Sequence, residues 1–237
     1  MQLTTTFRLL SDVEDCDGAR HRLEEVLGSE EVYGQDTPIT LVRILEECGL
    51  EGALDAIPAC TPNAEARSFG RLLACDYAEH VLPIAWDSRY PNDRRPWDAC
   101  RASREYASGI LSHAELEAAE RAAWNARDDC IHNSAVRARN TGIGAVVAAC
   151  AATGRTTQTA QAAITAVSMV AVAAARTKLA TALRTAADRL ERGYFAFLGR
   201  VSAPDEAVGA ATNLAATEEA AWQEARLREL LEAPSPA

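Results

Sequence analysis

The chain has 237 residues, of which 34 are acidic and 24 are lysine or arginine, so its formal net charge is −10. A chain of this length can bury a core without disulfides or metal ions, and its negative charge disfavours binding to the phosphate backbone of a nucleic acid. The partner that this charge favours is a basic protein surface.

The seven cysteines are scattered along the chain and never form a C-x-x-C pair. An odd, scattered set predicts free and mostly buried thiols in a reducing compartment. The first ten residues, MQLTTTFRLL, lack the charged stretch followed by a long apolar stretch that marks a secretory signal. We therefore expect a cytoplasmic protein.

The N-terminal part of the chain predicts short helices, because apolar residues recur there at three- and four-residue steps between glycines and prolines. The expected helices cover residues 16–27, 40–48 and 50–57. Gly28 and Gly49 end the first two, since glycine readily takes the left-handed conformation at a helix end. Residues 1–15 show no clear period, and residues 29–40 predict a loop.

Residues 67–109 predict a helical hairpin that holds most of the distinctive polar side chains of the chain. Its first helix is expected to bury a stripe formed by Phe69, Leu72, Leu73, Tyr77, Val81 and Ile84. Pro83 predicts a kink, because proline lacks an N–H and crowds the carbonyl four residues back. Asp93 can cap the second helix, Pro96 suits its first turn, and Gly109 closes it.

The rest of the chain is rich in alanine and predicts further helices, over residues 112–132, 145–152, 156–192 and 202–231. Ser112 and Glu115 fit a capping box at the start of the first of these. Residues 156–175 are uncharged and long enough to span a bilayer. Their threonines and glutamines favour a buried helix over a membrane span.

No segment shows sustained alternation of apolar and polar residues, so the sequence predicts an all-α protein. We expect a single compact bundle of about eight to nine helices with an alanine-rich C-terminal half. No stretch of linker-like composition divides the chain, and residues 1–237 are therefore expected to form one domain.

Charged and aromatic side chains of the hairpin form the candidate binding site. Antiparallel helices could bring Asp76 against a guanidinium group, with Arg95 or Arg101 as the expected partner. Arginine and aromatic residues, the favoured anchors of protein interfaces, crowd into the turn at residues 90–97. The alternative is an ion-pair network that only fixes the hairpin. The full candidate set is Asp76, Glu79, Tyr90, Asp93, Arg94, Arg95, Trp97, Arg101 and Arg104.

Signals for catalysis or metal binding are weak. Arg127 and His132 match the Arg-x4-His spacing of the all-helical HEPN ribonucleases, but the motif is short and the acidic charge suits RNA poorly. The four histidines lie on separate expected helices without a Glu-x-x-His pair, so no metal site is expected. Phosphate-binding glycine loops and a Gly-x-Ser-x-Gly motif are absent. We expect a protein that is not an enzyme and that needs no cofactor.

The hairpin resembles a known family. The segments that carry the likeness are RLLACDYAEHVLP at residues 71–83, YPNDRRP at 90–96, ASREYA at 102–107 and, upstream, residues 39–59 with LEGAL at 50–54. They are similar to the immunity-protein-five-like domain, an all-helical family thought to neutralise toxins of bacterial polymorphic systems and found also in phages. The resemblance covers residues 37–125, the immunity-like core, and leaves residues 126–231 as an alanine-rich helical extension.

The resemblance implies a non-enzymatic protein that neutralises a toxin or immune effector by stoichiometric binding. An alternative is a counter-defence protein in which Arg95, Arg101 and Arg104 clamp an anionic small molecule, such as a nucleotide signal. A third is an HEPN-like ribonuclease. The expected partner is a protein or an anionic small molecule, and neither a nucleic acid nor a membrane. Whether the chain forms a homo-oligomer stays open.

Overall fold

The computed structural model describes residues 2–13, 16–88, 90–133 and 203–233. Within these residues the chain forms eight α-helices and one pair of two-residue strands, so the protein is an all-α helical bundle. The helices predicted over residues 145–152 and 156–192 lie outside the described part. In that part, no helix is both long and apolar enough to cross a membrane.

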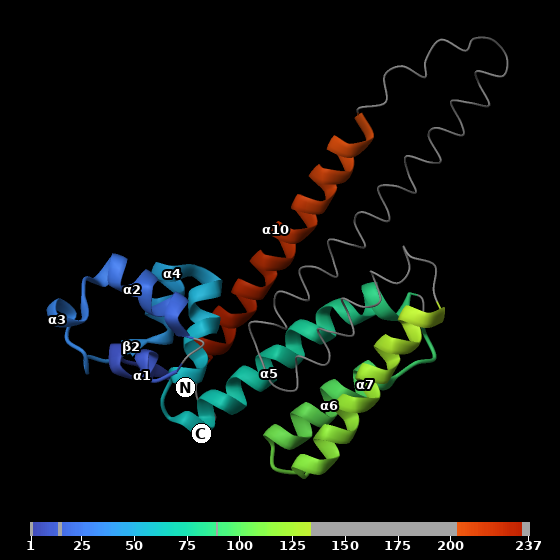
Figure 1. Ribbon diagram of the computed structural model, residues 1–237, viewed down its shortest axis with the longest axis horizontal. Helices are drawn as coiled ribbons and strands as arrows, with labels where there is room; N and C mark the ends of the chain where they lie inside the picture. The colour runs from blue at the N-terminus through green and yellow to red at the C-terminus, as the bar shows by residue number, and fades with distance from the viewer. Residues whose placement is uncertain (1, 14–15, 89, 134–202, 234–237) are drawn as a thin grey trace.

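Four helices and a 3₁₀ turn form the N-terminal end of the molecule (Figure 1). They are α1 (Phe7–Ser11), α2 (Asp17–Leu27), α3 (Glu30–Tyr33), α4 (Leu41–Ala56) and the turn η2 (Ile57–Ala59). The helix predicted over residues 16–27 is confirmed as α2. Those predicted over 40–48 and 50–57 form the single element α4. It is interrupted where predicted, because Gly49 has a φ of 71°, a conformation that an L side chain would strain.

A short strand pair, which the sequence did not predict, ties the N-terminus to this end. Strand β1 (Thr4–Thr5) pairs antiparallel with β2 (Ile39–Thr40), with Thr4 opposite Thr40. The backbone of Thr4 also exchanges hydrogen bonds with Thr61, at 3.3 and 2.7 Å. Two residues are too few to show the alternation by which a strand is recognised, so both segments look aperiodic in the sequence.

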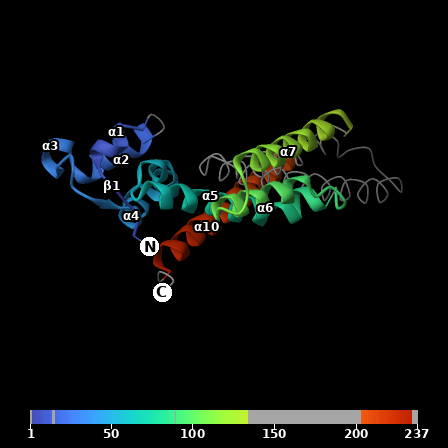
Figure 2. The ribbon, with the colours of Figure 1, turned by 90° about the horizontal axis from the view of Figure 1, so that it is seen from below.

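Helix α5 (Asn63–Leu82) connects the N-terminal helices to the other end of the molecule (Figures 1 and 2). A π turn, η3 (Pro83–Asp87), follows it, and then α6 (Arg95–Ala107) and α7 (His113–Asn133). The predicted hairpin is confirmed, and at Pro83, where the sequence predicts a kink, the helix changes to a π turn. Ile84, expected in the buried stripe, is instead 45% exposed, because the wider π turn shifts the helical register after Leu82.

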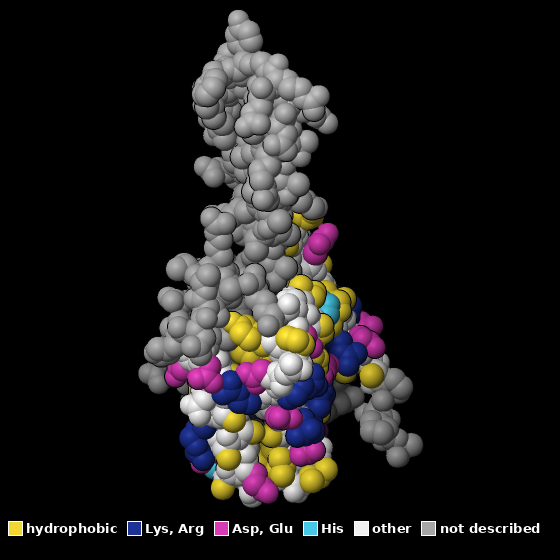
Figure 3. Space-filling model, turned by 90° about the vertical axis from the view of Figure 1, so that its right-hand side faces the viewer, with side chains coloured by type: hydrophobic (Ala, Val, Ile, Leu, Met, Phe, Trp, Pro, Cys, Tyr) yellow, Lys and Arg dark blue, Asp and Glu magenta, His cyan; other side chains and the backbone are white. Residues whose placement is uncertain are grey.

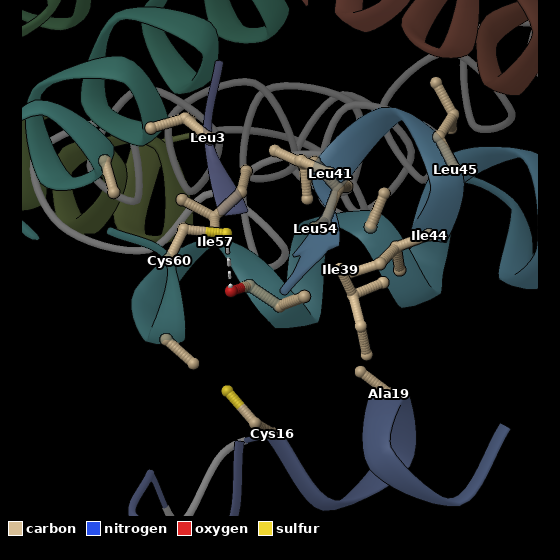
Figure 4. Close-up of a cluster of buried hydrophobic side chains, with 14 of the residues drawn as sticks. Leu3, Cys16, Ala19, Ile39, Leu41, Ile44, Leu45, Leu54, Ile57 and Cys60 are labelled. Carbon is tan, nitrogen blue, oxygen red and sulfur yellow. Dashed lines mark hydrogen bonds between the residues drawn. The ribbon is translucent and has the colours of Figure 1, made fainter. Parts of the chain in front are cut away.

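Buried side chains form two clusters, and α5 contributes to both. The first lies at the N-terminal end and is drawn in part in Figure 4, where Leu3 precedes β1 and Ile39, Leu41 and Ile57 come from β2, α4 and η2. The second joins α5, η3, α6 and α7 and consists mostly of alanines around the fully buried Trp86. Small side chains let helix backbones approach closely, so this bundle has a narrow core.

The last helix, α10 (Ala203–Glu232), returns to the N-terminal end. Leu227 and Leu231 belong to the same buried cluster as Leu3 and Phe7, so residues from both ends of the described chain share one core. Figure 1 shows the last turns of α10 beside α4 and its first turns pointing away from them. The helix predicted over residues 202–231 is confirmed for the described residues.

The five cysteines whose side chains the structure describes stand outside any disulfide, and four of them, Cys16, Cys60, Cys75 and Cys100, are buried. Burial raises the pKa of the Cys60 thiol to about 12 and that of Cys75 to about 11. For these five residues the prediction of free and mostly buried thiols is confirmed.

Candidate functional site

Carboxylates of α5 meet a guanidinium group of α6, as an antiparallel hairpin predicts. Arg104 donates from Nη2 to Asp76 Oδ1 at 2.6 Å and to Glu79 Oε2 at 2.7 Å, and from Nε to Glu79 Oε1 at 3.1 Å. The pair with Glu79 is bidentate, the stronger geometry for these groups. The hydrogen bonds with Glu79 and then Asp76 raise the pKa of Arg104 above its usual value.

Arg226, from α10, completes this cluster and was not a candidate in the sequence. Its Nε donates to Asp76 Oδ2 at 2.7 Å, and its Nη1 donates to Glu229 at 2.8 Å. Asp76 therefore binds one arginine with each oxygen, and its side chain is only 13% exposed. Arg226 lies 150 residues after Asp76 and forms no local pattern with it, so only the tertiary fold reveals the contact.

The expected pairing of Asp76 with Arg95 or Arg101 is wrong. Arg101 is 67% exposed and pairs with Asp98 and Glu105 of its own helix. Helix α6 buries Cys100 and Ser103, and this orientation turns Arg101 toward solvent.

The turn between η3 and α6 is held by the buried indole of Trp86. The Nε1 of Trp86 donates to the Asp93 carbonyl oxygen at 2.8 Å. The centres of the Trp86 and Tyr90 rings lie 4.6 Å apart. Tyr90 therefore packs on Trp86 and is partly buried.

Asp93 and Arg95 hold the start of α6. The Arg95 backbone N–H donates to Asp93 Oδ1 at 3.2 Å, and its guanidinium group binds both Asp93 oxygens at 3.0 and 2.7 Å. The predicted capping by Asp93 is wrong in its position: Arg94 occupies the N-cap without a side-chain cap hydrogen bond, and Asp93, one residue earlier, accepts from the first N–H of α6 instead. Hydrogen bonding from Arg95 lowers the pKa of Asp93. Arg95 also pairs with Asp129 of α7 at 2.8 Å, which ties the turn to the third helix of the bundle.

Arg94 and Trp97 are the candidate residues of the turn that stack on each other at the surface. Arg94 is exposed, and its guanidinium carbon lies 4.9 Å from the centre of the Trp97 ring, a cation–π contact. The half-buried Trp97 donates from Nε1 to Asp87 Oδ1 at 2.9 Å, which fixes the orientation of the indole.

The candidate arginines do not gather into one cluster. Arg95, Arg101 and Arg104 bind different carboxylates, so an anionic ligand would have to displace a carboxylate at each. On the described part of the face drawn in Figure 3, arginine and acidic side chains lie interspersed. This pattern is typical of a surface that pairs its own charges.

Nothing in the described residues is arranged like a metal centre, since no three His, Cys, Asp or Glu side chains there come close enough together. Arg127 and His132 are the pair with ribonuclease-like spacing. The guanidinium carbon of Arg127 lies 5.0 Å from the centre of the Trp124 ring, and its Nη1 lies 3.4 Å from Asp128 Oδ1. The side chain of His132 lies outside the described part, so this pair stays a prediction.

Comparison of the chain with protein-family models, with curated proteins and with solved structures gives no match. The likeness of residues 37–125 to the immunity family therefore stays a prediction, and the functional argument rests on the side chains placed above.

Proposed function

We propose that this chain is a non-enzymatic binding protein that neutralises a protein partner, a toxin or an immune effector, by stoichiometric occlusion in the cytoplasm. This is the function that the resemblance of the hairpin implies. The proposed contact surface is the turn formed by residues 90–97.

The observation that carries the proposal is the stacked pair of Arg94 and Trp97. Arginine and tryptophan are the residue types that most often dominate binding energy at protein interfaces. The hydrogen bond from Trp97 to Asp87 fixes the indole before any partner arrives. A side chain that is already ordered loses less conformational entropy on binding, so the pair is a preorganised anchor.

The other residues of the turn support this anchor. Tyr90 packs on Trp86, and Arg95 is held by Asp93 and Asp129. These contacts make the turn rigid and leave Arg94 and Trp97 to meet the partner. A standard interface buries about 800 Å² on each side, so the surface extends beyond the turn, and the net charge of −10 favours a basic partner.

The test is affinity capture from the native cell with tagged wild-type chain, the Arg94→Ala variant and the Arg101→Ala variant. Arg101 is the matched control, because it is an exposed arginine seven residues further along whose ion pairs, within the described residues, are with Asp98 and Glu105 of its own helix. Mass spectrometry should find a protein bound to the wild type and to Arg101→Ala and lost from Arg94→Ala. Circular dichroism should show all three chains equally folded.

The same experiment separates the competing explanations. A nucleotide that co-purifies in place of a protein would favour an anion clamp. A protein retained equally by Arg94→Ala and wild type would show that the turn is not the contact surface.

A further inference from the structure

Arg94 differs from the other described arginines of the turn and of α6 in the partner of its guanidinium group. Arg95, Arg101 and Arg104 each form at least one ion pair with a nitrogen–oxygen distance of 2.9 Å or less. In the described part of the chain, no hydrogen bond or ion pair joins the guanidinium group of Arg94 to another residue, and the group lies over the ring of Trp97. Its charge is therefore the one in this set that no carboxylate of the described residues balances directly.

The stack on Trp97 leaves the hydrogen-bonding edge of Arg94 available. The five N–H groups of a guanidinium lie in its plane, so a ring that covers one face of the group does not occupy them. Trp97 is itself held by the hydrogen bond to Asp87, and the Arg94 side chain is exposed. The turn therefore carries a flat row of donors on a fixed aromatic ring.

The carboxylates nearest to Arg94 in the sequence are engaged by other arginines. Asp93 binds the Arg95 guanidinium group with both of its oxygens, and Asp98 pairs with Arg101 at 2.9 Å. A partner that covers Arg94 removes water from its N–H groups, and a covered guanidinium group without an anion is costly. The partner itself therefore has to supply the negative charge.

Resting on the proposed function, we propose that the protein partner inserts an aspartate or glutamate carboxylate, which Arg94 binds through two parallel N–H···O bonds. The planar guanidinium group matches a carboxylate in this geometry, and such pairs are stronger than neutral hydrogen bonds. The net charge of −10 favours a basic partner surface at long range. The carboxylate is one local contact within that surface, and it fixes how the partner is aligned on the turn.

The test is carbodiimide cross-linking of the captured protein to Arg94→Lys, with Arg101→Lys as the matched control. The carbodiimide activates a carboxyl group, the amine attacks it to form an amide, and the carbodiimide leaves as a urea that has taken up the water. The chain has a single lysine, Lys178, so each variant adds one amine at a known position and the wild type gives the background. Peptide mass spectrometry identifies the joined residues. The reaction is run at concentrations above the dissociation constant of Arg94→Lys.

We expect the amine of Arg94→Lys to couple to an aspartate or glutamate of the captured protein. The amine of Arg101→Lys should not couple to that protein, because the ion pairs of Arg101 are with Asp98 and Glu105 of its own helix. Isothermal titration should show that Arg94→Lys binds about tenfold more weakly than the wild type, because an ammonium group keeps the charge but not the planar fork.

Two results would overturn this inference and leave the proposed function intact. One is a captured protein that binds the wild type more tightly than Arg94→Ala yet does not couple to Arg94→Lys. The other is equal affinity of the wild type and Arg94→Lys together with weaker binding by Arg94→Ala, which would exclude the two-bond geometry. Equal binding by the wild type and Arg94→Ala would overturn the inference and the proposed contact surface together.

Discussion

At the scale of single residues, Asp93 is the side chain whose ionisation most directly holds the proposed contact turn. Its pKa is lowered by hydrogen bonds from Arg95, so its carboxylate stabilises the fold while it is charged. That stability is fully present above the unfolded pKa of about 3.9 and is lost as the pH falls through the lower folded pKa.

We predict that Asp93→Asn costs about 1 kcal/mol of unfolding free energy at pH 7 and progressively less below about pH 4. Urea unfolding of both chains across this pH range measures the difference. Asp36→Asn is the control, because Asp36 forms an exposed ion pair with Arg8 that contributes little. A constant difference between Asp93→Asn and wild type down to pH 2 would contradict the role of the charge.

Some of these residue-scale features can be predicted from the sequence because they are local. The hydrogen bond that Asp93 accepts at the start of α6, the closing glycine Gly109 with its φ of 71° and the Ser112 capping box all depend on neighbours within a few positions. The stacking of Arg94 on Trp97 is also a short-range contact. Which arginine meets Asp76 depends on how α6 is rotated against α5, and sequence spacing does not determine that rotation.

At the scale of elements, the cluster of Asp76, Glu79, Arg104 and Arg226 joins three helices. Arg104 binds two carboxylates of α5, so its loss removes the bidentate partner of Glu79 while Asp76 keeps its ion pair with Arg226. Arg101, one turn earlier, forms its ion pairs in the described part of the chain with Asp98 and Glu105 of α6 itself.

We predict that Arg104→Ala lowers the unfolding free energy by about 1 to 2 kcal/mol, below the value for a fully buried pair because its side chain is 35% exposed. Arg101→Ala should change it by less than about 0.5 kcal/mol. Chemical unfolding followed by far-ultraviolet circular dichroism gives both numbers. Equal effects would mean that the cluster does not stabilise the helix packing.

The boundaries of the longer helices can be predicted, because the apolar period, proline and glycine mark them. The short helices α1 and α3 lie in segments for which the sequence predicts no helix. The register after Pro83 is not predictable in this way, since the π turn places Ile84 outside the stripe. The strand pair at Thr4 and Thr40 escapes prediction because it is set by long-range backbone pairing alone.

At the scale of the whole molecule, the two ends of the described chain depend on each other. Leu227 of α10 is fully buried beside residues of α1, α4 and the N-terminus, whereas Leu214 of the same helix is 60% exposed. The alanine-rich composition of the C-terminal half predicts helices, but it does not indicate which leucine enters a core formed by residues about 200 positions earlier.

We predict that Leu227→Ala costs about 2 to 4 kcal/mol and lowers the melting temperature of the whole chain, because it opens a cavity in the shared core. The matched variant Leu214→Ala should change the unfolding free energy by less than about 0.5 kcal/mol. Differential scanning calorimetry of the two variants makes the comparison. A Leu227→Ala chain as stable as Leu214→Ala would show that α10 is not part of the core.

The central claim is that this chain occludes a protein partner through the turn at residues 90–97. The most direct measurement is isothermal titration of the captured protein with the wild type, Arg94→Ala and Arg101→Ala, in buffer that contains a metal chelator and no nucleotide. We predict one-to-one binding by the wild type and by Arg101→Ala, and binding at least about tenfold weaker by Arg94→Ala. Binding that requires metal or nucleotide, or equal affinities for the two arginine variants, would contradict the claim.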